Sequence, residues 1–292
     1  MGTKAGTIVV GVDASESSMR ALAWAVEQAQ IEHRQLTLVH AVNGVLPAYT
    51  PASAVFPEEA RVAVREDGHQ ILAAAVAEVE RTAPTLEVQA LFRLEDPRNV
   101  LLEMSHDAAM VVLGSRGRGR VATLLLGSVG VALVRHAHCP VVVHRPSHPG
   151  KVRNGVLVGA DGSEESLAVL EFAYREASLR DLPLTVVHCF WDVNAATSAA
   201  YTVREPDLDR QSERLLLAES MAGMAEKFPE VNVRTTMAMG LPQDVLVHVG
   251  ERMNLLVVGA HQSSKVSRLL FGGSVSVAVV EHANCPVAVV PV

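Results

Sequence analysis

The chain carries the same pattern twice, and this duplication constrains its fold more than any other feature. Residues 7–18, TIVVGVDASESS, return 148 positions later at 155–166 as GVLVGADGSEES. HAHCPVVVH at 136–144 returns at 282–290 as HANCPVAVV. A period of this length corresponds to a whole domain, because solenoid repeats run about 20–50 residues. We therefore predict two copies of one domain, at residues 1–146 and 155–292, joined by a linker at 147–154.

Composition narrows the class of protein. The 292 residues are 49% hydrophobic and 20% charged, as in globular proteins, and the formal net charge is −7. A nucleic-acid partner is not expected, because such proteins carry a basic excess. The apolar runs are shorter than the ~20 residues that span a bilayer, so we expect no membrane partner. The N-terminus leads straight into a predicted strand, which favours a cytoplasmic location without a signal peptide.

Short apolar runs alternate with longer amphipathic stretches in both copies. The predicted strands of the first copy are at 8–12, 36–42, 86–92, 109–114 and 140–144, and its predicted helices are at 15–33, 58–82, 128–137 and a short segment beginning at Asp96–Pro97. Those of the second copy are strands near 156–160, 184–190, 231–238, 254–259 and 286–291, and helices near 163–181, 206–228, 242–252 and 274–283. This alternation predicts an α/β fold, a parallel sheet with helices on both faces.

The first helix and the expected strand order indicate where a site would lie. The residues Met19, Leu22, Ala23, Val26 and Ala29–Gln30 are spaced like an apolar stripe, with Ser15 as the N-cap. Parallel sheets of this class bind ligands beyond the carboxyl ends of strands, where the strand order reverses. The segments after strands one and four are therefore the candidates for a site.

A glycine-rich segment, GSRGRGRVATLLLGSVG, follows the fourth strand at 114–130. Gly114 and Gly117 allow close approach of a ligand to the backbone, and successive N–H groups of such a loop form anion-binding nests. Gly127 and Ser128 lie where the next helix begins, which favours phosphate, and Ser128 is the predicted N-cap. Three arginines add positive charge: Arg116, Arg118 and Arg120. The alternative is a surface loop before a capped helix, because the segment lacks P-loop and dinucleotide spacings.

These motifs resemble those of tandem universal stress proteins of the ATP-binding subgroup, and actinobacterial members in particular. That subgroup carries a glycine, two residues, a second glycine, nine residues and then Gly–Ser or Gly–Thr after strand four. The residues Gly114, Gly117, Gly127 and Ser128 match this pattern without a gap. VGVD at 10–13, VHA at 39–41 and CPVVV at 139–143 match as well, so the resemblance covers both halves.

The resemblance implies a flavodoxin-like (adenine nucleotide alpha hydrolase-like) domain in each half, with a five-stranded parallel sheet of order 3-2-1-4-5. It implies ATP, with Mg²⁺, between strands one and four. Gly11 and Asp13 would lie against the adenosine, and the backbone of Ala41 would meet the adenine edge. The contacts implied with ribose and phosphates are at Gly114, Ser115, Arg116, Gly117 and Arg118, and those with the β- and γ-phosphates are at Gly127, Ser128 and Val129.

The second copy departs from this pattern. Its binding residues retained by the same resemblance are Gly159, Asp161, Gly259, Gly273, Ser274 and Val275. Gln262 replaces the second glycine, and the interval from Gly259 to Gly273 is one residue longer than in the first copy. Because Gln262 carries a Cβ, a left-handed conformation there would cost roughly 1 kcal/mol or more. The second site is either a weaker ATP site or a domain retained for pairing.

Other polar residues have simpler interpretations. Asp13 and Asp161 could be turn residues, but their repetition at the switch point favours ligand contact. His40 and His188 lie inside predicted strands and are expected to be core histidines. His136, His138 and Cys139 lack a second cysteine at zinc spacing, so no metal ligands are predicted. The three cysteines form no close pair, and we expect buried thiols rather than disulfides.

No nucleophile–base pair or paired carboxylates stand out, so the sequence predicts a nucleotide-dependent regulator of stress adaptation or growth arrest, with at most weak ATP hydrolysis. A slow ATP-hydrolysing switch enzyme and a binder of another adenine nucleotide, such as cyclic AMP, are the alternatives. The expected partners are ATP, a second chain in a homodimer and an unknown regulatory protein. The two domains are expected to pair through their terminal strands, 140–144 and 286–290, whose edges would otherwise stay exposed.

Overall fold

The structure, a computed structural model, describes residues 5–43, 58–117, 126–146, 153–190, 202–203, 211–260 and 274–292. The loop predicted at 43–57 lies almost wholly outside this part of the chain. The contacts divide the chain into two compact units, unit 1 (Met1–His144) and unit 2 (Arg145–Val292). Each unit is described by itself.

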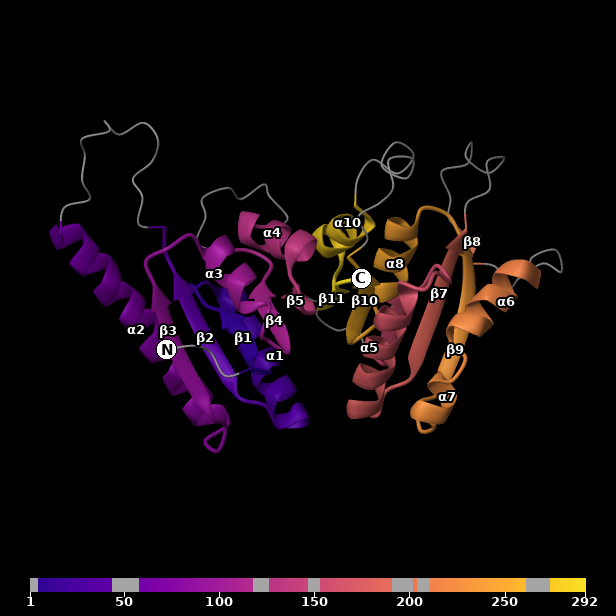
Figure 1. Cartoon of the computed structure of the whole chain (residues 1–292), viewed down its shortest axis with the longest axis horizontal. Coiled ribbons are helices and arrows are strands. Elements are labelled where there is room, and N and C mark those ends of the chain that lie inside the picture. The colour runs from indigo at the N-terminus through magenta and orange to yellow at the C-terminus, as the bar shows by residue number, and fades with distance from the viewer. Residues whose placement is uncertain are drawn as a thin grey trace. The chain divides into compact units, whose positions relative to one another are not determined.

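Unit 1 is a parallel sheet covered by helices (Figure 1). Its strands are β1 (Ile8–Gly11), β2 (Leu36–Ala41), β3 (Val88–Arg93), β4 (Met110–Gly114) and β5 (Val141–His144). Its helices are α1 (Glu16–Glu32), α2 (Glu58–Thr82), α3 (Pro97–Met104) and α4 (Ser128–His136). The strand order is β3-β2-β1-β4-β5, and every pairing is parallel. Helices α1 and α2 contact one another, as do α3 and α4, so one helix pair covers each face.

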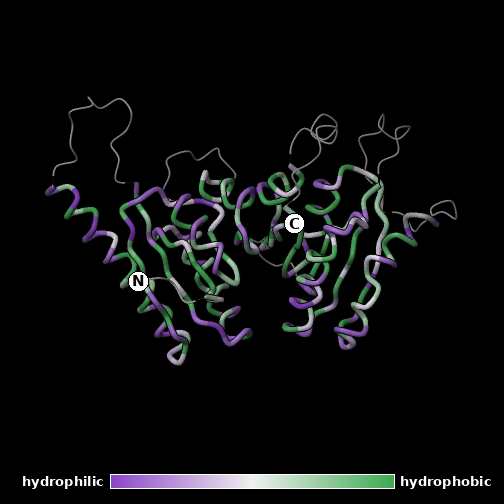
Figure 2. Tube along the Cα trace, in the orientation of Figure 1, coloured by the Kyte–Doolittle hydropathy of each residue, from purple (hydrophilic) through white to green (hydrophobic). Residues whose placement is uncertain are grey.

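The core of unit 1 lies along the central strands. Ile8, Leu38 and Val112 are fully buried, and Figure 2 shows hydrophobic residues running along these strands. Continuous apolar runs are expected where both faces of a parallel strand are covered. Strand β3 is only partly buried, and it lies at the end of the sheet, next to β2. Burial thus fixes β1 and β4 at the centre of the unit, with their carboxyl ends side by side.

Helix α1 confirms one prediction and corrects another. Ser15 is the N-cap, and its hydroxyl accepts a hydrogen bond from the Ser18 amide at 3.2 Å. The buried face includes Ala21, Leu22, Ala25, Val26 and Ala29, whereas Ala23 and Gln30, predicted for the apolar stripe, are exposed. The predicted stripe is wrong at these two positions because each follows a buried residue, and a helix of 3.6 residues per turn rotates the next side chain by about 100° toward solvent.

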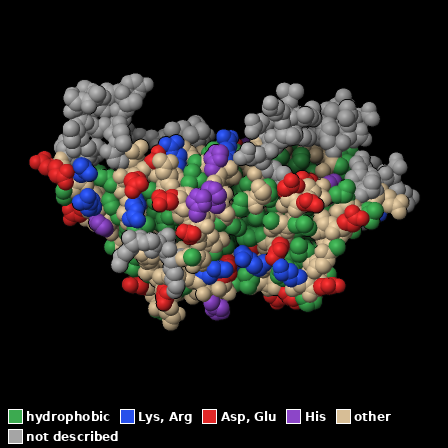
Figure 3. Space-filling model, viewed as in Figure 1, with side chains coloured by type: hydrophobic (Ala, Val, Ile, Leu, Met, Phe, Trp, Pro, Cys, Tyr) green, Lys and Arg blue, Asp and Glu red, His purple; other side chains and the backbone are tan. Residues whose placement is uncertain are grey.

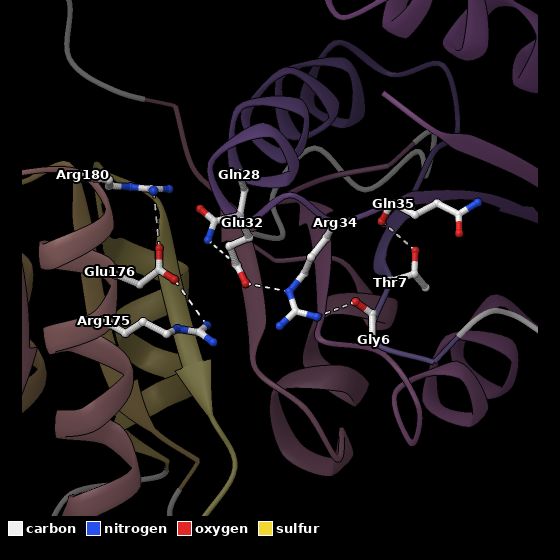
Figure 4. Close-up of polar contacts among 9 residues, drawn as sticks. All are labelled: Gly6, Thr7, Gln28, Glu32, Arg34, Gln35, Arg175, Glu176 and Arg180. Atoms are coloured by element: carbon white, nitrogen blue, oxygen red, sulfur yellow. Dashed lines mark hydrogen bonds and ion pairs between the residues drawn. The ribbon is translucent and has the colours of Figure 1, made fainter. Parts of the chain in front are cut away.

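Buried polar side chains on α1 satisfy one another (Figure 4). Gln28 is fully buried and donates to Glu32 Oε1 at 2.5 Å. Arg34 donates from Nε to Glu32 Oε2 at 2.8 Å and from a guanidinium nitrogen to the Gly6 carbonyl, also at 2.8 Å. Buried charges require such partners, because an unpaired charge in the interior is costly. Through Arg34, the segment before β1 is hydrogen-bonded to the end of α1.

Unit 2 repeats the architecture with one addition (Figure 1). Its strands are β6 (Val156–Gly159), β7 (Leu184–Phe190), β8 (Thr202–Val203), β9 (Val233–Met239), β10 (Leu255–Gly259) and β11 (Val287–Val290). Its helices are α5 (Ser166–Leu179), α6 (Gln211–Ser220), α7 (Met224–Lys227), α8 (Pro242–Gly250) and α10 (Val275–His282). The strand order is β8-β9-β7-β6-β10-β11. All pairings are parallel except that of β8 with β9.

One prediction for unit 2 was incomplete and another was wrong. The five predicted parallel strands are present, and the two-residue strand β8 adds an antiparallel edge to β9. The single helix predicted near 206–228 is interrupted between α6 and α7 within the described residues. The cause is Gly223, whose φ of +83° lies in the left-handed region that breaks a right-handed helix.

Unit 2 also has a buried polar cluster on its first helix. Figure 4 shows Glu176 between Arg175 and Arg180, with both ion-pair distances at 3.5 Å. Glu176 is fully buried and is the repeat equivalent of Gln28. The same helical position therefore carries a neutral amide in one unit and a paired carboxylate in the other.

The described surface is mixed in charge. Figure 3 shows acidic side chains lying among basic ones over the described surface in view, so neither sign dominates this face. No helix among the described residues combines the length and the apolar character needed to cross a bilayer.

Candidate functional site

A cavity of about 300 Å³ opens in unit 1 where the strand order reverses between β1 and β4. Ten residues predicted for the site line it: Gly11, Asp13, Ala41, Gly114, Ser115, Arg116, Gly117, Gly127, Ser128 and Val129. Arg118 and Arg120 lie outside the described residues. Residues from four separate segments of sequence therefore meet in one hollow, as the topology predicts for parallel sheets.

The end of the cavity near β2 is built from backbone and apolar side chains. The Val12 amide donates to the Val39 carbonyl at 2.9 Å, which extends the parallel pairing beyond β1. The His40 ring donates from Nδ1 to the Val12 carbonyl at 2.6 Å. His40 is only 5% exposed, which confirms it as a core histidine. Pro97 and Leu101 of α3 complete an apolar wall.

The glycine-rich segment is held at both ends. The hydroxyls of Ser15 and Ser17 donate to the Arg116 carbonyl. At the far end, the Gly127 amide donates to the Ser115 carbonyl at 3.2 Å. These contacts join the start of α1 to the segment after β4, and they place Arg116 in the lining. The serine cluster DASESS indicates from sequence that several hydroxyls lie together before α1. It does not indicate which acceptor each hydroxyl contacts.

Asp13 has a structural role in addition to its place in the cavity. Its Oδ1 accepts a hydrogen bond from the Ser15 amide at 3.0 Å, which forms the turn before α1. The side chain is half-buried and lines the cavity. The turn interpretation and the ligand interpretation of Asp13 are therefore compatible.

The N-terminus of α4 differs from the prediction in one respect. The N-cap is Gly127, with φ −70° and ψ 158°, and Ser128 is the first helical residue rather than the cap. The amides of Ser128, Val129 and Gly130 lack intrahelical acceptors because these are the first three residues of the helix. The Gly127 amide, in contrast, donates to the Ser115 carbonyl. Gly130 lines the cavity and was missed by the sequence prediction. Three clustered amides at a helix start favour an anion.

Seven lining residues of unit 1 were not predicted. They are Val12, Ser18, Val39, Pro97, Leu101, Leu113 and Gly130. Most are apolar and belong to strand ends or to α3, so sequence alone marked them as core.

Unit 2 has a smaller cavity, of about 150 Å³, at the repeat-equivalent place. Of the residues predicted there, Gly159, Asp161, Gly259 and Val275 line it. Ser274 is the N-cap of α10 and is not among the lining residues, and Gly273 and Gln262 lie outside the described residues. Lining residues that the prediction missed are Ala160, Ser166, Val169, Val187, Cys189, Pro242, Leu246, Val258 and Ser276.

The remaining histidines and cysteines have local partners. His188 donates from Nδ1 to the Ala160 carbonyl at 3.0 Å. The His138 ring stacks on His106, with ring centroids 3.6 Å apart. Within the part of the chain that the structure describes, no group of three or more metal-binding side chains is found. All three cysteines are free thiols, and burial raises the pKa of each to about 12. Cys139 and Cys285 are buried as predicted, whereas Cys189 is half-buried in the cavity wall of unit 2.

Comparisons with known proteins identify the family of the chain. The family model of the universal stress protein family matches residues 4–145 and again 153–291. A universal stress protein of Mycobacterium tuberculosis strain H37Rv is 37% identical over 97% of this chain and 96% of its own length. One from Mycolicibacterium smegmatis is 33% identical over 97% of this chain and 96% of its own length.

A solved structure shares the fold across both units. The crystal structure of a universal stress protein from Archaeoglobus fulgidus aligns with a TM-score of 0.71 at 19% identity, and covers 98% of this chain and 96% of that one. The chain therefore belongs to the universal stress protein family and carries two copies of the family's flavodoxin-like α/β domain.

Proposed function

We propose that unit 1 binds ATP together with Mg²⁺, and that the chain is a nucleotide-dependent regulator of stress adaptation or growth arrest. The observation that carries this proposal is the meeting of a glycine-rich segment and the start of α4 in one cavity at the strand-order reversal. Amides 128–130 and Arg116 suit phosphate, while the opposite end of the cavity is apolar and suits a base.

Each part of the nucleotide has a matching part of the cavity. The adenine would lie between Val39, Ala41 and Leu101, where backbone groups at the end of β2 can meet its polar edge. The ribose would lie near Asp13. The phosphates would extend past Gly114 and Gly117 toward Ser128. The Mg²⁺, when bound, supplies charge neutralisation for the triphosphate, and its remaining ligands would be water, as is usual for this ion.

ATP would act on partners by linking two segments of unit 1. A nucleotide that contacts both the glycine-rich segment and α4 stabilises the arrangement in which these two lie together. A ligand shifts an equilibrium only by its differential affinity for two states, so the surface beside this cavity is where a regulatory protein would sense occupancy. Pairing of the two domains and homodimer formation stay predictions within this proposal.

The side chains that line the unit 1 cavity favour ATP binding over ATP hydrolysis. Among the described residues that line the unit 1 cavity, Asp13 is the one carboxylate, and it already accepts the amide of Ser15. A general base must reach the attacking water, and a carboxylate engaged in a turn is a poor candidate. We therefore expect ATP to stay intact on the protein.

Mass spectrometry of the small molecules released from purified, denatured protein tests the proposal. The expected result is ATP, with phosphate release from added Mg-ATP no faster than in a protein-free control. Recovery of cyclic AMP in place of ATP would support the other adenine-nucleotide interpretation. Steady phosphate release that disappears in an Asp13→Ala variant would support the switch-enzyme interpretation.

A further inference from the structure

The two cavities of the chain differ at the end where phosphates would lie. We propose that only unit 1 accepts ATP, and that the unit 2 cavity accepts an adenine nucleoside without a phosphate tail. This inference rests on the proposed function, because it takes unit 1 as the reference for an ATP site.

The base end is retained in unit 2. Val187 and Cys189 line its cavity at the positions of Val39 and Ala41 in unit 1. The Ala160 amide donates to the Val187 carbonyl at 3.0 Å, as the Val12 amide donates to Val39. Backbone groups at the end of β7 are therefore placed as those at the end of β2, and the surroundings are as apolar.

The serine hydroxyls have changed partners. In unit 1, Ser15 donates to the Arg116 carbonyl, and Ser18 donates to the Ser15 carbonyl at 2.9 Å. Their equivalents in unit 2, Ser163 and Ser166, both donate to Asp161 Oδ1 instead. The Ser15 hydroxyl, which holds the glycine-rich segment in unit 1, is thus matched in unit 2 by the Ser163 hydroxyl, which holds a carboxylate.

The third member of the serine cluster is missing from unit 2. Ser17, whose hydroxyl donates to the Arg116 carbonyl, corresponds to Glu165, which is exposed. The substitution removes a hydroxyl anchor and adds a negative charge near the start of α5. Both effects disfavour a bound triphosphate, the first through lost positioning and the second through repulsion.

The start of α10 is also altered. Gly130 of unit 1 corresponds to Ser276, whose hydroxyl lies 2.8 Å from that of Ser274. The Ser274 hydroxyl, the equivalent of the phosphate-facing Ser128, is therefore engaged within the protein. In addition, Ser276 places a side chain in the cavity wall where unit 1 has none.

Size points the same way. The unit 2 cavity has half the volume of the unit 1 cavity, about 150 Å³ against about 300 Å³. Both linings include one aspartate, Asp13 in unit 1 and Asp161 in unit 2. The smaller cavity suits a nucleoside better than a nucleotide with a triphosphate tail.

Equilibrium dialysis of the full chain against Mg-ATP, and separately against adenosine, tests the inference by stoichiometry. The expected result is one ATP and two adenosines per chain at saturation. Two ATP per chain would overturn it. One adenosine per chain would overturn the nucleoside site in unit 2 and leave the proposed function standing. No ATP at all would contradict the proposed function itself.

A matched pair of variants tests which of the two units binds the ATP. Ser128→Glu and Ser274→Glu each place a carboxylate at a helix start, where the helix dipole favours it, so both proteins should fold. Ser128→Glu should weaken ATP binding by at least about tenfold, the loss expected when a charge-assisted contact is replaced by repulsion. Ser274→Glu should leave ATP affinity unchanged. The reverse pattern would overturn the inference.

A cavity-filling variant tests whether the second adenosine binds in the unit 2 cavity. Cys189→Phe places a ring in the unit 2 cavity and should reduce adenosine to one per chain while ATP stays at one. Retention of two adenosines by this variant would show that the second nucleoside binds elsewhere, and would overturn the assignment. A thermal unfolding curve matching the parent protein is the control for folding.

Discussion

A methyl group on Gly117 would lie 2.5 Å from Asp13 Oδ2. The carboxylate that follows β1 therefore lies directly against the glycine-rich segment that follows β4. Real Cβ atoms do not approach oxygen this closely, so any larger residue at 117 would force the Asp13 carboxylate to shift. The repeat-equivalent position carries Gln262, so unit 2 lacks the glycine that lies against the aspartate in unit 1.

Replacement of Gly117 by alanine should displace the Asp13 carboxylate from the cavity wall. Under the proposed function, ATP affinity should fall by about tenfold or more, because misplacing one polar group that meets the ligand costs ~1.5–3 kcal/mol. Isothermal titration calorimetry measures the change. Thermal unfolding is the control, and an unchanged affinity in a folded Gly117→Ala protein would show that Asp13 does not position the nucleotide.

Gly114 and Gly127 should respond differently to the same substitution. A methyl on Gly114 would lie 2.6 Å from the backbone carbonyl carbon of Ser17, so Gly114→Ala should lower the free energy of unfolding by ~1–3 kcal/mol. Nothing lies within 4 Å of a methyl on Gly127, whose φ of −70° any residue adopts. Gly127→Ala should stay within ~0.5 kcal/mol of the parent protein.

Urea denaturation followed by circular dichroism measures both values. Equal losses of stability in the two variants would contradict the packing described for Gly114. A loss of ATP affinity in the stable Gly127→Ala variant would add support for a ligand at the start of α4.

Loss of the Ser17 hydroxyl should loosen the glycine-rich segment. Ser17→Ala removes the hydrogen bond to the Arg116 carbonyl and should lower the free energy of unfolding by ~0.5–1.5 kcal/mol. ATP affinity should fall with it, because Arg116 would be held less firmly. Glu165→Ala, at the equivalent exposed position of unit 2, is the matched control and should change neither quantity. Equal effects from both substitutions would contradict the role given to Ser17.

Stability should decline in alkali because of the three thiols. Burial raises the pKa of Cys139, Cys189 and Cys285 from 9.0 to about 12 in the folded chain. Above pH 9 the unfolded chain loses thiol protons that the folded chain retains, so the free energy of unfolding should fall between pH 9 and 12. Well below pH 9, where the thiols are protonated in both the folded and the unfolded chain, these groups should contribute no slope.

Denaturation at a series of pH values from 7 to 11 checks this expectation. Tyr174, whose pKa burial also raises, contributes in the same direction, so the comparison is with a variant in which all three cysteines are alanine. The slope above pH 9 should be smaller in that variant. An identical slope would show that the thiols are not responsible.

The sequence predicted most of the architecture because buried parallel strands leave an unbroken apolar signature. Strands β1, β4 and β10 lie within the predicted runs, and α2 begins at Glu58 and ends at Thr82 as predicted. Pro97 occupies the first turn of α3, as its fixed φ favours. The two-residue strand β8 was not predictable, because so short a pairing depends on its neighbour β9 and not on local pattern.

The candidate site was predictable where it depends on topology, and not where it depends on side-chain conformation. The reversal between β1 and β4 brings Asp13 and Gly114 to one cavity, and this follows from strand order. Which hydroxyl bonds which acceptor does not follow, because Ser18 and Ser166 occupy equivalent positions but donate to a backbone carbonyl and to a carboxylate, respectively. The apolar wall from Leu101 was missed because a cavity wall and a core residue share one pattern.

The central claim is that amides 128–130 and the glycine-rich segment of unit 1 hold the phosphates of ATP. A crystal structure of the full chain soaked with millimolar Mg-ATP tests it most directly. We predict electron density for a triphosphate against the start of α4, with the base between Ala41 and Leu101. An empty unit 1 cavity in such crystals, or a triphosphate bound only in unit 2, would contradict it.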